Sequence, residues 1–144
     1  MNLKKIGFIE TAYLRIEDCP KNTRFSEGYA SLYIDNEYID GLLDIESASH
    51  LIVLYWLDKA DRSVYQAKTV RADGKLRGCF ATRTPNRPNP IGFSVVKLLE
   101  KNENKLLVSG LDCISGTIIL DIKPYIANND AFNDAIVSWQ DSVQ

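Results

Sequence analysis

The sequence predicts a mostly β fold, a small barrel or sandwich, and three observations lead to this prediction. Apolar runs recur along the 144 residues, some alternating with polar residues and some continuous. The breaks between these runs are short, and few stretches carry the spacing of a helix. Consecutive strands without crossover helices pack as a barrel or a sandwich. We therefore expect a small β-barrel with short helical segments and one C-terminal helix.

The expected strands follow the apolar runs in chain order. They span residues 5–13, 29–34, 50–57, 64–70, 91–99, 105–111 and 117–122. The run His50–Leu57 (HLIVLYWL) lacks polar alternation, which predicts a strand buried on both faces. Asn102, Glu103 and Asn104 form a compact turn between two of the runs, so the flanking strands are predicted to pair as a hairpin.

Helix is expected in two places. Residues 40–48 favour a short helix before the buried strand. Residues 129–143 favour an amphipathic one, behind Asn129 and Asp130 as candidate caps. Its apolar stripe consists of Phe132, Ala135, Ile136, Trp139 and Val143. Such a stripe must be covered, and either the chain's own barrel or a second subunit could cover it.

Composition indicates one globular domain, 1–144, with no general nucleic-acid signature. Net charge is −2 and pI about 5.4, with 45% hydrophobic and 25% charged residues. The region 70–97 is nevertheless basic, with one acid, Asp73, against Arg71, Lys75, Arg77, Arg83, Arg87 and Lys97. This region suits an anionic ligand or RNA phosphates, and a solvated polar surface is the alternative.

Targeting and metal-binding patterns are absent from the sequence. No run approaches a membrane span, and the start has no apolar segment of useful length. Cys19, Cys79 and Cys113 are odd in number and form no CxxC pair, so neither disulfides nor a metal are expected. Small buried thiols of this kind are typical of a reducing cytoplasm.

The most informative stretch is residues 77–94, RGCFATRTPNRPNPIGFS. Proline fixes φ, removes a backbone donor and pushes the preceding residue into an extended conformation. The segment is therefore predicted to be a stiff loop that carries guanidinium and amide groups, which suits a binding site. Asn89 lies between Pro88 and Pro90, where its amide could orient an adenine N6 or a cofactor group, or merely stabilise a turn.

Two further places carry candidate catalytic side chains. Asp121, Lys123 and Tyr125 alternate along an expected strand and so share one face. This face is either a solvent-exposed ion pair or a substrate cleft in which Asp121 or Tyr125 accepts a proton. His50 opens the most apolar run, where a lone histidine serves as a structural residue or as a catalyst.

The motifs of this chain closely resemble those of the TrmO (YaeB-like) S-adenosylmethionine-dependent methyltransferases. The stretch ATRTPNRPNPIGFSVVKL resembles the family signature ATRSPxRPNPIGLSxVxL. Four shorter segments match in the same order: Ile6–Ile9, Gly41–Leu42, Ser49–Leu51 and Leu111–Tyr125. The similarity covers nearly the whole chain.

The resemblance implies a small β-barrel methyltransferase domain that works as a homodimer, here without the C-terminal extension of many bacterial relatives. It also implies methylation of N6 of threonylcarbamoyl-adenosine, the base 3′ of the tRNA anticodon. The cofactor contacts that it implies are Pro20, Lys21, Asn22, Asp58, Lys59, Arg83, Phe93, Ile114, Ser115, Gly116 and Thr117. Catalytic candidates are Asn89, Asp121, Tyr125 and His50.

The chain departs from the family pattern within the implied pocket. Lys21-Asn22 replaces Arg-Gln, Asp58-Lys59 replaces His-Gln, and Ser115 replaces an acid. Lysine cannot reproduce the bidentate fork of arginine. Two alternatives therefore stay open: methylation of another RNA or of a small molecule, and a non-catalytic module that holds an anion or RNA through the proline-rich loop.

Overall fold

The computed structural model describes residues 1–19 and 28–141, which form two compact units. The first unit consists of Met1–Leu57 and Ile91–Tyr125. The second consists of residues 58–90 and the segment that begins at Ile126. Among the described residues, no helix is long and apolar enough to cross a bilayer.

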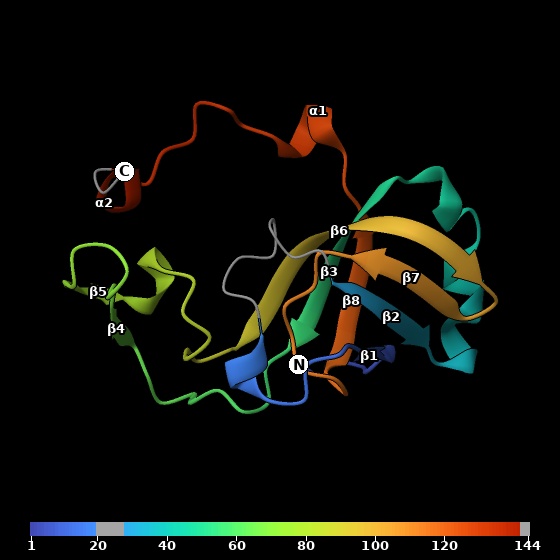
Figure 1. The fold of residues 1–144 in the computed structure, drawn as a ribbon, viewed down its shortest axis with the longest axis horizontal. Helices are drawn as coiled ribbons and strands as arrows, with labels where there is room; N and C mark the ends of the chain where they lie inside the picture. The colour runs from blue at the N-terminus through green and yellow to red at the C-terminus, as the bar shows by residue number, and fades with distance from the viewer. Residues whose placement is uncertain (20–27, 142–144) are drawn as a thin grey trace. The chain divides into compact units, whose positions relative to one another are not determined.

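The first unit is a closed barrel, as the sequence predicts (Figure 1). Around the barrel the strand order is β1, β2, β7, β6, β3 and β8, with neighbours antiparallel. The strands are β1 Gly7–Glu10, β2 Tyr29–Ile34, β3 His50–Trp56, β6 Ile91–Asn102, β7 Lys105–Ser109 and β8 Ile118–Pro124. Closure pairs β1 with β8, so the barrel has no open sheet edge.

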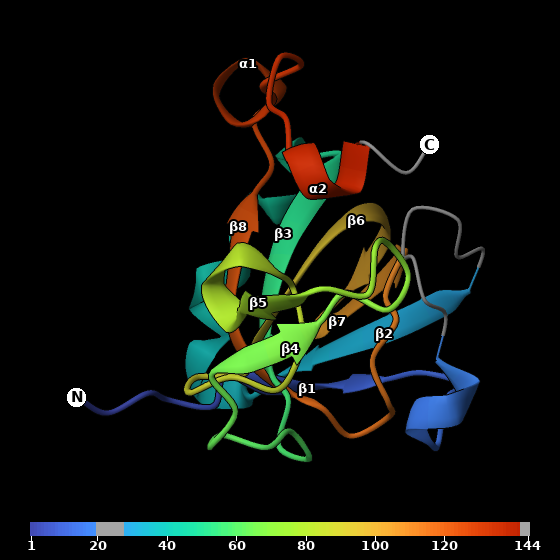
Figure 2. The ribbon, with the colours of Figure 1, turned by 90° about the vertical axis from the view of Figure 1, so that its left-hand side faces the viewer.

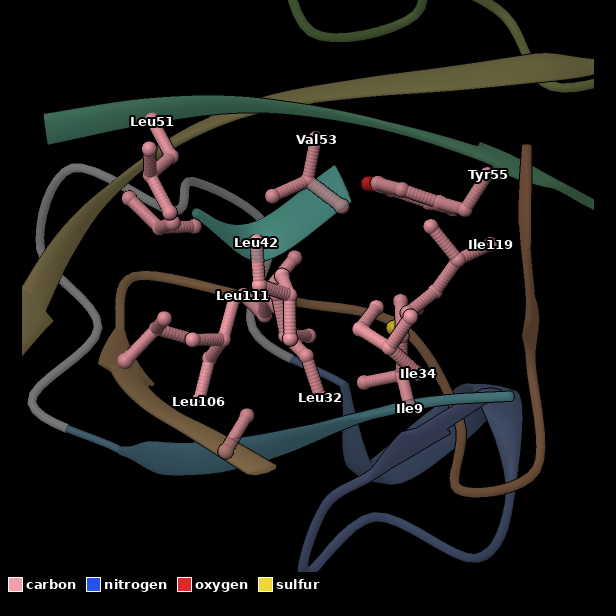
Figure 3. Packing of buried hydrophobic residues seen from close by; sticks show 14 residues of the cluster. Ile9, Leu32, Ile34, Leu42, Leu51, Val53, Tyr55, Leu106, Leu111 and Ile119 are labelled. Atoms are coloured by element: carbon pink, nitrogen blue, oxygen red, sulfur yellow. The ribbon is translucent and has the colours of Figure 1, made fainter. Parts of the chain in front are cut away.

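The barrel interior is filled by side chains from every strand (Figure 3). Its members include Ile9, Leu32, Leu51, Val53, Leu106, Leu111 and Ile119. Each of these is at most 1% exposed. In β3 the inward positions alternate with half-exposed ones, so the prediction of a strand buried on both faces is wrong. A barrel strand has only one side toward the interior, whatever the polarity of its outer side.

The predicted hairpin at Asn102–Asn104 joins β6 and β7. Glu103 takes the left-handed conformation with φ 55°, and the Asn104 side chain donates to the Ile34 carbonyl at 2.9 Å. The β6–β7 register shifts between Leu98 and Glu100. Such an irregularity adds local twist, and β6 bends strongly as it runs around the barrel (Figure 2).

The second unit holds a small hairpin, β4 Gln66–Lys68 and β5 Leu76–Gly78. The expected strand over residues 64–70 is therefore shorter than predicted, and β5 was not expected. Gly74, with φ 70°, lies in the turn between the two strands. The Asp73 carboxylate accepts from the Lys75 backbone N–H at 3.1 Å and is paired with Arg77 at 2.6 Å. These contacts explain how so short a hairpin forms.

The expected helix over residues 40–48 is replaced by two 3₁₀ segments, η3 Asn36–Leu42 and η4 Ile45–Ser47. Further 3₁₀ segments within the described residues are η1 Ile16–Asp18 and η5 Cys79–Ala81. Asp44, which has a left-handed conformation with φ 64°, lies between η3 and η4 and interrupts the helical conformation. A left-handed residue cannot continue a right-handed helix, so the segment splits there.

The continuous helix expected over residues 129–143 is also wrong. Two single turns replace it, α1 Ala127–Asp130 and α2 Ser138–Asp141. Phe132 and Ile136 of the expected stripe are 71% and 79% exposed, and Val143 lies outside the described residues. A short helix forms mainly where packing buries its apolar face, and the exposed side chains of Phe132 and Ile136 are not buried in this way. Trp139 instead contacts Arg77, whose guanidinium lies 4.9 Å from the centre of its ring.

Candidate functional site

The outward side chains of three neighbouring strands form one surface, which we call the β6–β3–β8 face. Alternation places Leu51, Val53 and Tyr55 inside the barrel and their neighbours outside. The outward members are His50, Ile52, Leu54 and Trp56 of β3, Ile91, Phe93, Val95 and Lys97 of β6, and Ile118, Asp121 and Lys123 of β8. One end of this face is apolar and aromatic, whereas the other is polar and charged.

An irregularity in β8 decides which way Asp121 points. Tyr55 pairs with Ile119, but the next residue of β3, Leu54, pairs with Asp121. Leu120 is thus an extra residue, a β-bulge, between two paired positions. Beyond it, Ile122 packs against the core, whereas Asp121 shares the outward side of Leu54.

The register brings one implied cofactor contact and one candidate catalytic residue into the same row. Phe93 pairs with Leu54 on one side, and Asp121 pairs with Leu54 on the other. Their backbones are therefore about 10 Å apart, because adjacent strands are spaced by about 4.8 Å. Phe93 is 51% exposed and Asp121 is half-buried. An aromatic ring and a carboxylate thus share one face, at a separation that a nucleoside can span.

The charged end of the face holds Asp121 and His50, and Tyr125 follows the end of β8 there. The Lys123 ammonium lies 2.7 Å from Asp121 Oδ2, and the Ile122 N–H donates to Asp121 Oδ1 at 2.9 Å. His50 is exposed, with Nδ1 2.9 Å from the Ser49 hydroxyl, and its carbonyl accepts from the Tyr125 N–H at 3.0 Å. His50 and Tyr125 are therefore neighbours.

His50 and Tyr125 lie at the opposite end of the strands from the segment Ile114–Thr117. That segment leads directly into β8 at Ile118, whereas Tyr125 follows the last residue of β8. Tyr125 lies seven positions after Ile118, at about 3.3 Å per position, so the two ends are about 20 Å apart. The structure therefore groups Asp121 with Phe93 but does not bring His50 and Tyr125 to Ile114–Thr117.

The segment Ile114–Thr117 is held against β1 and the chain that follows it. The N–H groups of Ser115 and Gly116 donate to the carbonyls of Tyr13 and Ile9, both at 2.7 Å. Thr117 donates its hydroxyl and its N–H to the Ile114 carbonyl, at 2.6 and 3.3 Å. Three consecutive N–H groups are thus used within the protein. A ligand docked here would meet carbonyl oxygens, which suit donors such as an adenine amino group.

Gly116 supplies the conformation that this segment needs. Its φ is 91°, a region that residues with a Cβ rarely adopt, and it is exposed. The neighbouring Ser115 hydroxyl accepts from the Thr11 N–H at 3.2 Å. The segment is consequently preorganised, with one open edge at the glycine.

The proline-rich loop in the second unit is stiffened by arginines as well as by prolines. Arg87 donates to the carbonyls of Cys79 and Thr84, both at 2.7 Å, and to that of Thr82. Its guanidinium therefore serves the loop itself. Together with the Asp73–Arg77 pair, this contact assigns two arginines of the basic region to structure.

Asn89 is fixed by a residue that the sequence did not single out. Arg62 donates from Nε to the Pro88 carbonyl at 2.8 Å and from its terminal nitrogen to Asn89 Oδ1 at 3.2 Å. The Asn86 side chain likewise accepts from the Asp61 N–H at 2.8 Å. The segment after Asp58 is thus bound to the proline-rich loop, an association of distant residues that no local pattern reveals.

The remaining implied cofactor contacts are exposed residues of the second unit or lie outside the described residues. Asp58, Lys59 and Arg83 belong to the second unit and are exposed. Pro20, Lys21 and Asn22 lie outside the described residues.

A polar cluster inside the barrel was also missed. The Tyr55 ring points into the interior, where its hydroxyl lies 2.9 Å from Ser94 Oγ and donates to Asp112 Oδ1 at 3.0 Å (Figure 3). Tyr55 is 4% and Ser94 2% exposed. Burial raises the pKa of Tyr55 above its ordinary range, and burial likewise raises the pKa of Asp112, against the lowering effect of the Tyr55 hydrogen bond. Period-two alternation in β3 and β6 places Tyr55 and Ser94 inward, but nothing local connects them to Asp112.

Comparison with known proteins assigns the family. A family model described as the tRNA-methyltransferase O N-terminal domain matches residues 8–131. The chain belongs to the TrmO family. The match runs through residues of both units.

Relatives of this TrmO-family chain include archaeal and animal proteins. An S-adenosyl-L-methionine-binding protein of Archaeoglobus fulgidus is 42% identical, covering 92% of this chain and 95% of that protein. A second A. fulgidus protein, named a probable S-adenosyl-L-methionine-binding protein, is 44% identical, covering 96% and 38%. The tRNA (adenine(37)-N6)-methyltransferase of Rattus norvegicus is 35% identical, covering 88% and 31%. The chain thus spans about a third of the last two and nearly all of the first.

Solved structures show the same family fold. A crystal structure titled TrmO superposes with a TM-score of 0.82 at 29% identity, covering 94% of this chain and 62% of that one. TrmO from Pseudomonas aeruginosa gives 0.78 at 31% identity, covering 94% and 60%.

Proposed function

We propose that this protein is an S-adenosylmethionine-dependent methyltransferase that methylates N6 of threonylcarbamoyl-adenosine beside the tRNA anticodon. The observation that carries the proposal is the family match over residues 8–131. Relatives named for S-adenosyl-L-methionine binding and for methylation of tRNA adenine 37 support the cofactor and the acceptor. An anticodon loop presents unstacked bases, so the enzyme has no duplex to open.

The residues present fit a bound S-adenosylmethionine. The open edge at Gly116 and the carbonyls of the surrounding segment suit an adenine, and the exposed ring of Phe93 suits a sulfonium cation. Asp58, Lys59 and Arg83, with Pro20, Lys21 and Asn22, complete the proposed contacts. When bound, the cofactor supplies a methyl group on a sulfonium, activated for transfer to nitrogen.

The protein's part in the reaction is positioning and the removal of one proton. Positioning of two reactants accounts for much of the rate of such a transfer, because it replaces a bimolecular encounter. We propose Asp121 as the proton acceptor, since it shares a row with Phe93. The side-chain amide of Asn89, held by Arg62, is proposed to orient the adenine N6 or a cofactor group. His50 and Tyr125 remain candidates for the RNA side of the site.

We further propose that residues 1–144 act as one domain, in a homodimer, in the cytoplasm. The single family match across both units supports the first point. The face that carries Phe93 and Ile91, 51% and 42% exposed, offers apolar surface for a subunit contact. Cys19, Cys79 and Cys113 are free thiols, which agrees with a reducing compartment.

A second acceptor is favoured by one specific observation. Asp58-Lys59 and Ser115 depart from the TrmO pattern at implied pocket positions. A changed pocket can keep the cofactor and accept another RNA or a small molecule. A non-catalytic module that binds an anion or RNA through the proline-rich loop has no observation in its favour beyond that loop.

Two measurements test the proposal. Calorimetry with S-adenosylmethionine is expected to show stoichiometric binding, and no heat up to millimolar cofactor contradicts it. Radiolabelled methyl transfer to tRNA, followed by mass spectrometry of the nucleosides, is expected to yield methylated threonylcarbamoyl-adenosine. Label in another RNA or in a small molecule supports the second acceptor, and binding without any transfer supports the module.

A further inference from the structure

The Asp112 carboxylate has a position that a purely structural role does not explain. It lies in the loop between β7 and β8, half-buried, and is fixed by the Tyr55 hydroxyl at 3.0 Å. Tyr55 is in turn fixed by Ser94 at 2.9 Å. This chain of hydrogen bonds runs from the barrel interior to the loop and defines the direction of one carboxylate.

The charge of Asp112 is not needed by the partners that fix it. The Tyr55 hydroxyl donates to Asp112 Oδ1, and an asparagine at this position would offer the same acceptor oxygen. Burial raises the pKa of Asp112, which means that ionisation is disfavoured in the folded protein. An amide would therefore hold Tyr55 at a smaller cost in stability.

Asp112 is also close to the segment proposed for the nucleoside. Cys113 follows it, and the Cys113 carbonyl accepts from the Thr11 hydroxyl at 3.0 Å, within the set of bonds that ties Ile114–Thr117 to the end of β1. The carboxylate and this segment are thus held in one rigid loop. The ribose of a nucleoside is bonded directly to its base. A nucleoside whose base docks on the carbonyls of this segment would therefore carry its ribose close to the loop that holds Asp112.

We propose that the Asp112 carboxylate accepts hydrogen bonds from the ribose hydroxyls of S-adenosylmethionine, with Tyr55 and Ser94 as positioning residues. This inference rests on the proposed function. Two vicinal hydroxyls match the two oxygens of a carboxylate, and charge-assisted bonds of this kind are short and strong.

The test is calorimetry on the full chain with two ligands, S-adenosylhomocysteine and 5′-methylthioadenosine. Both carry the adenine and ribose, but only the first carries the amino-acid part. Asp112→Asn is expected to weaken both ligands by a similar factor of about 10 or more, because hydrogen bonds to charged groups are worth more than neutral ones. Asp40→Asn, an exposed aspartate of η3, is the matched control and is expected to leave both affinities unchanged.

A pH series separates positioning from a merely structural effect. The affinity of the unmodified protein is expected to fall as Asp112 is protonated, whereas Asp112→Asn lacks this acid limb. Because the Tyr55 hydrogen bond lowers the pKa of Asp112, Tyr55→Phe is expected to move the acid limb to higher pH. Thermal melts by circular dichroism establish that each variant is folded before its affinity is compared.

Each outcome decides between the proposals. Equal affinity of Asp112→Asn and the unmodified protein for both ligands overturns the ribose contact and leaves the methyltransferase proposal intact. A loss confined to S-adenosylhomocysteine overturns it as well, since the amino-acid part is then the partner. If the unmodified protein binds neither ligand, the proposed function fails and this inference fails with it.

Discussion

A Cβ placed on Gly92 of β6 would lie 2.1 Å from Cε2 of Tyr55, which faces it from β3. The glycine therefore makes the space for the ring, and the ring in turn carries its hydroxyl to Ser94 and Asp112. The close approach of one backbone and one aromatic ring is thus the basis of the polar cluster in the barrel.

Gly92→Ala is expected to lower the free energy of unfolding by about 1–3 kcal/mol, the usual cost of overpacking a core. The Tyr55 ring cannot move aside without losing its hydroxyl partners. Thermal or denaturant unfolding measures the loss. Gly41→Ala is the matched control, because nothing lies within 4 Å of a Cβ added there. Equal effects of the two substitutions would contradict the prediction.

Tyr55→Phe removes the hydroxyl that bonds to buried Ser94 and half-buried Asp112. We expect a loss of about 1–3 kcal/mol in the free energy of unfolding, because each of these two groups loses a hydrogen-bond partner. A double-mutant cycle with Ser94→Ala, followed by urea unfolding, measures the coupling. The two losses should be less than additive, and strict additivity would mean that the two hydroxyls do not interact in solution.

Asp112 gives stability a pH dependence whose sign follows from its raised pKa. The folded state binds the Asp112 proton more tightly than the unfolded chain, in which an aspartate titrates near about 3.9. The stability that comes from this tighter proton binding is fully present below the pKa of the unfolded chain. It is lost as pH rises through the pKa of Asp112 in the folded protein. Asp112→Asn should therefore gain stability relative to the unmodified protein between acid and neutral pH. A constant difference across that range, measured by thermal unfolding, would count against the burial effect.

Substitution of Arg87 and of Arg83 by alanine is expected to affect different properties, stability for Arg87 and ligand binding for Arg83, although both residues belong to the proline-rich loop. Arg87→Ala removes hydrogen bonds to three carbonyls and should cost about 1.5–3 kcal/mol of stability. Arg83→Ala, at an exposed position, should lower the melting temperature less than Arg87→Ala does, and should weaken binding of S-adenosylmethionine or RNA. Melting curves and calorimetry on both variants test the contrast, and exchanged phenotypes would refute it.

The three thiols should react at different rates. Burial raises the pKa of Cys113 to about 12, so almost no thiolate forms at neutral pH, whereas Cys19 is only partly buried. Iodoacetamide followed by mass spectrometry is expected to label Cys19 first, and Cys19→Ser should remove the fast phase. Rapid native labelling of Cys113 would show that the loop between β7 and β8 opens.

The barrel was predictable because its strands are short and the breaks between them are clear. The pairing of β6 with β7 confirms the hairpin predicted at Asn102–Asn104. This prediction succeeded because its signal lies in adjacent residues. The prediction of a helix over residues 129–143 failed because periodicity shows only that an apolar stripe exists, not that other residues pack against it. The prediction that β3 is buried on both faces was wrong for a related reason: the composition of a strand does not say which of its sides faces the core.

The candidate site was predictable only where a motif carries it. Alternation of Asp121 and Lys123 gave their common face, and the structure confirms their ion pair. The row that joins Asp121 to Phe93 depends on register across three strands, which single-strand patterns do not contain. The contact of Arg62 with Asn89 and that of Tyr55 with Asp112 join residues far apart in sequence, and only folding brings them together.

Leu120 has a consequence for how this surface tolerates changes in length. Deleting it would place Asp121 directly after Ile119 and restore regular pairing with β3, with Asp121 and Lys123 still facing outward and Ile122 still facing the core. A one-residue deletion at this position would thus remove the bulge and keep the charged end of the site. Leu120 is therefore the position of β8 at which the strand can be shortened without turning its charged side chains inward.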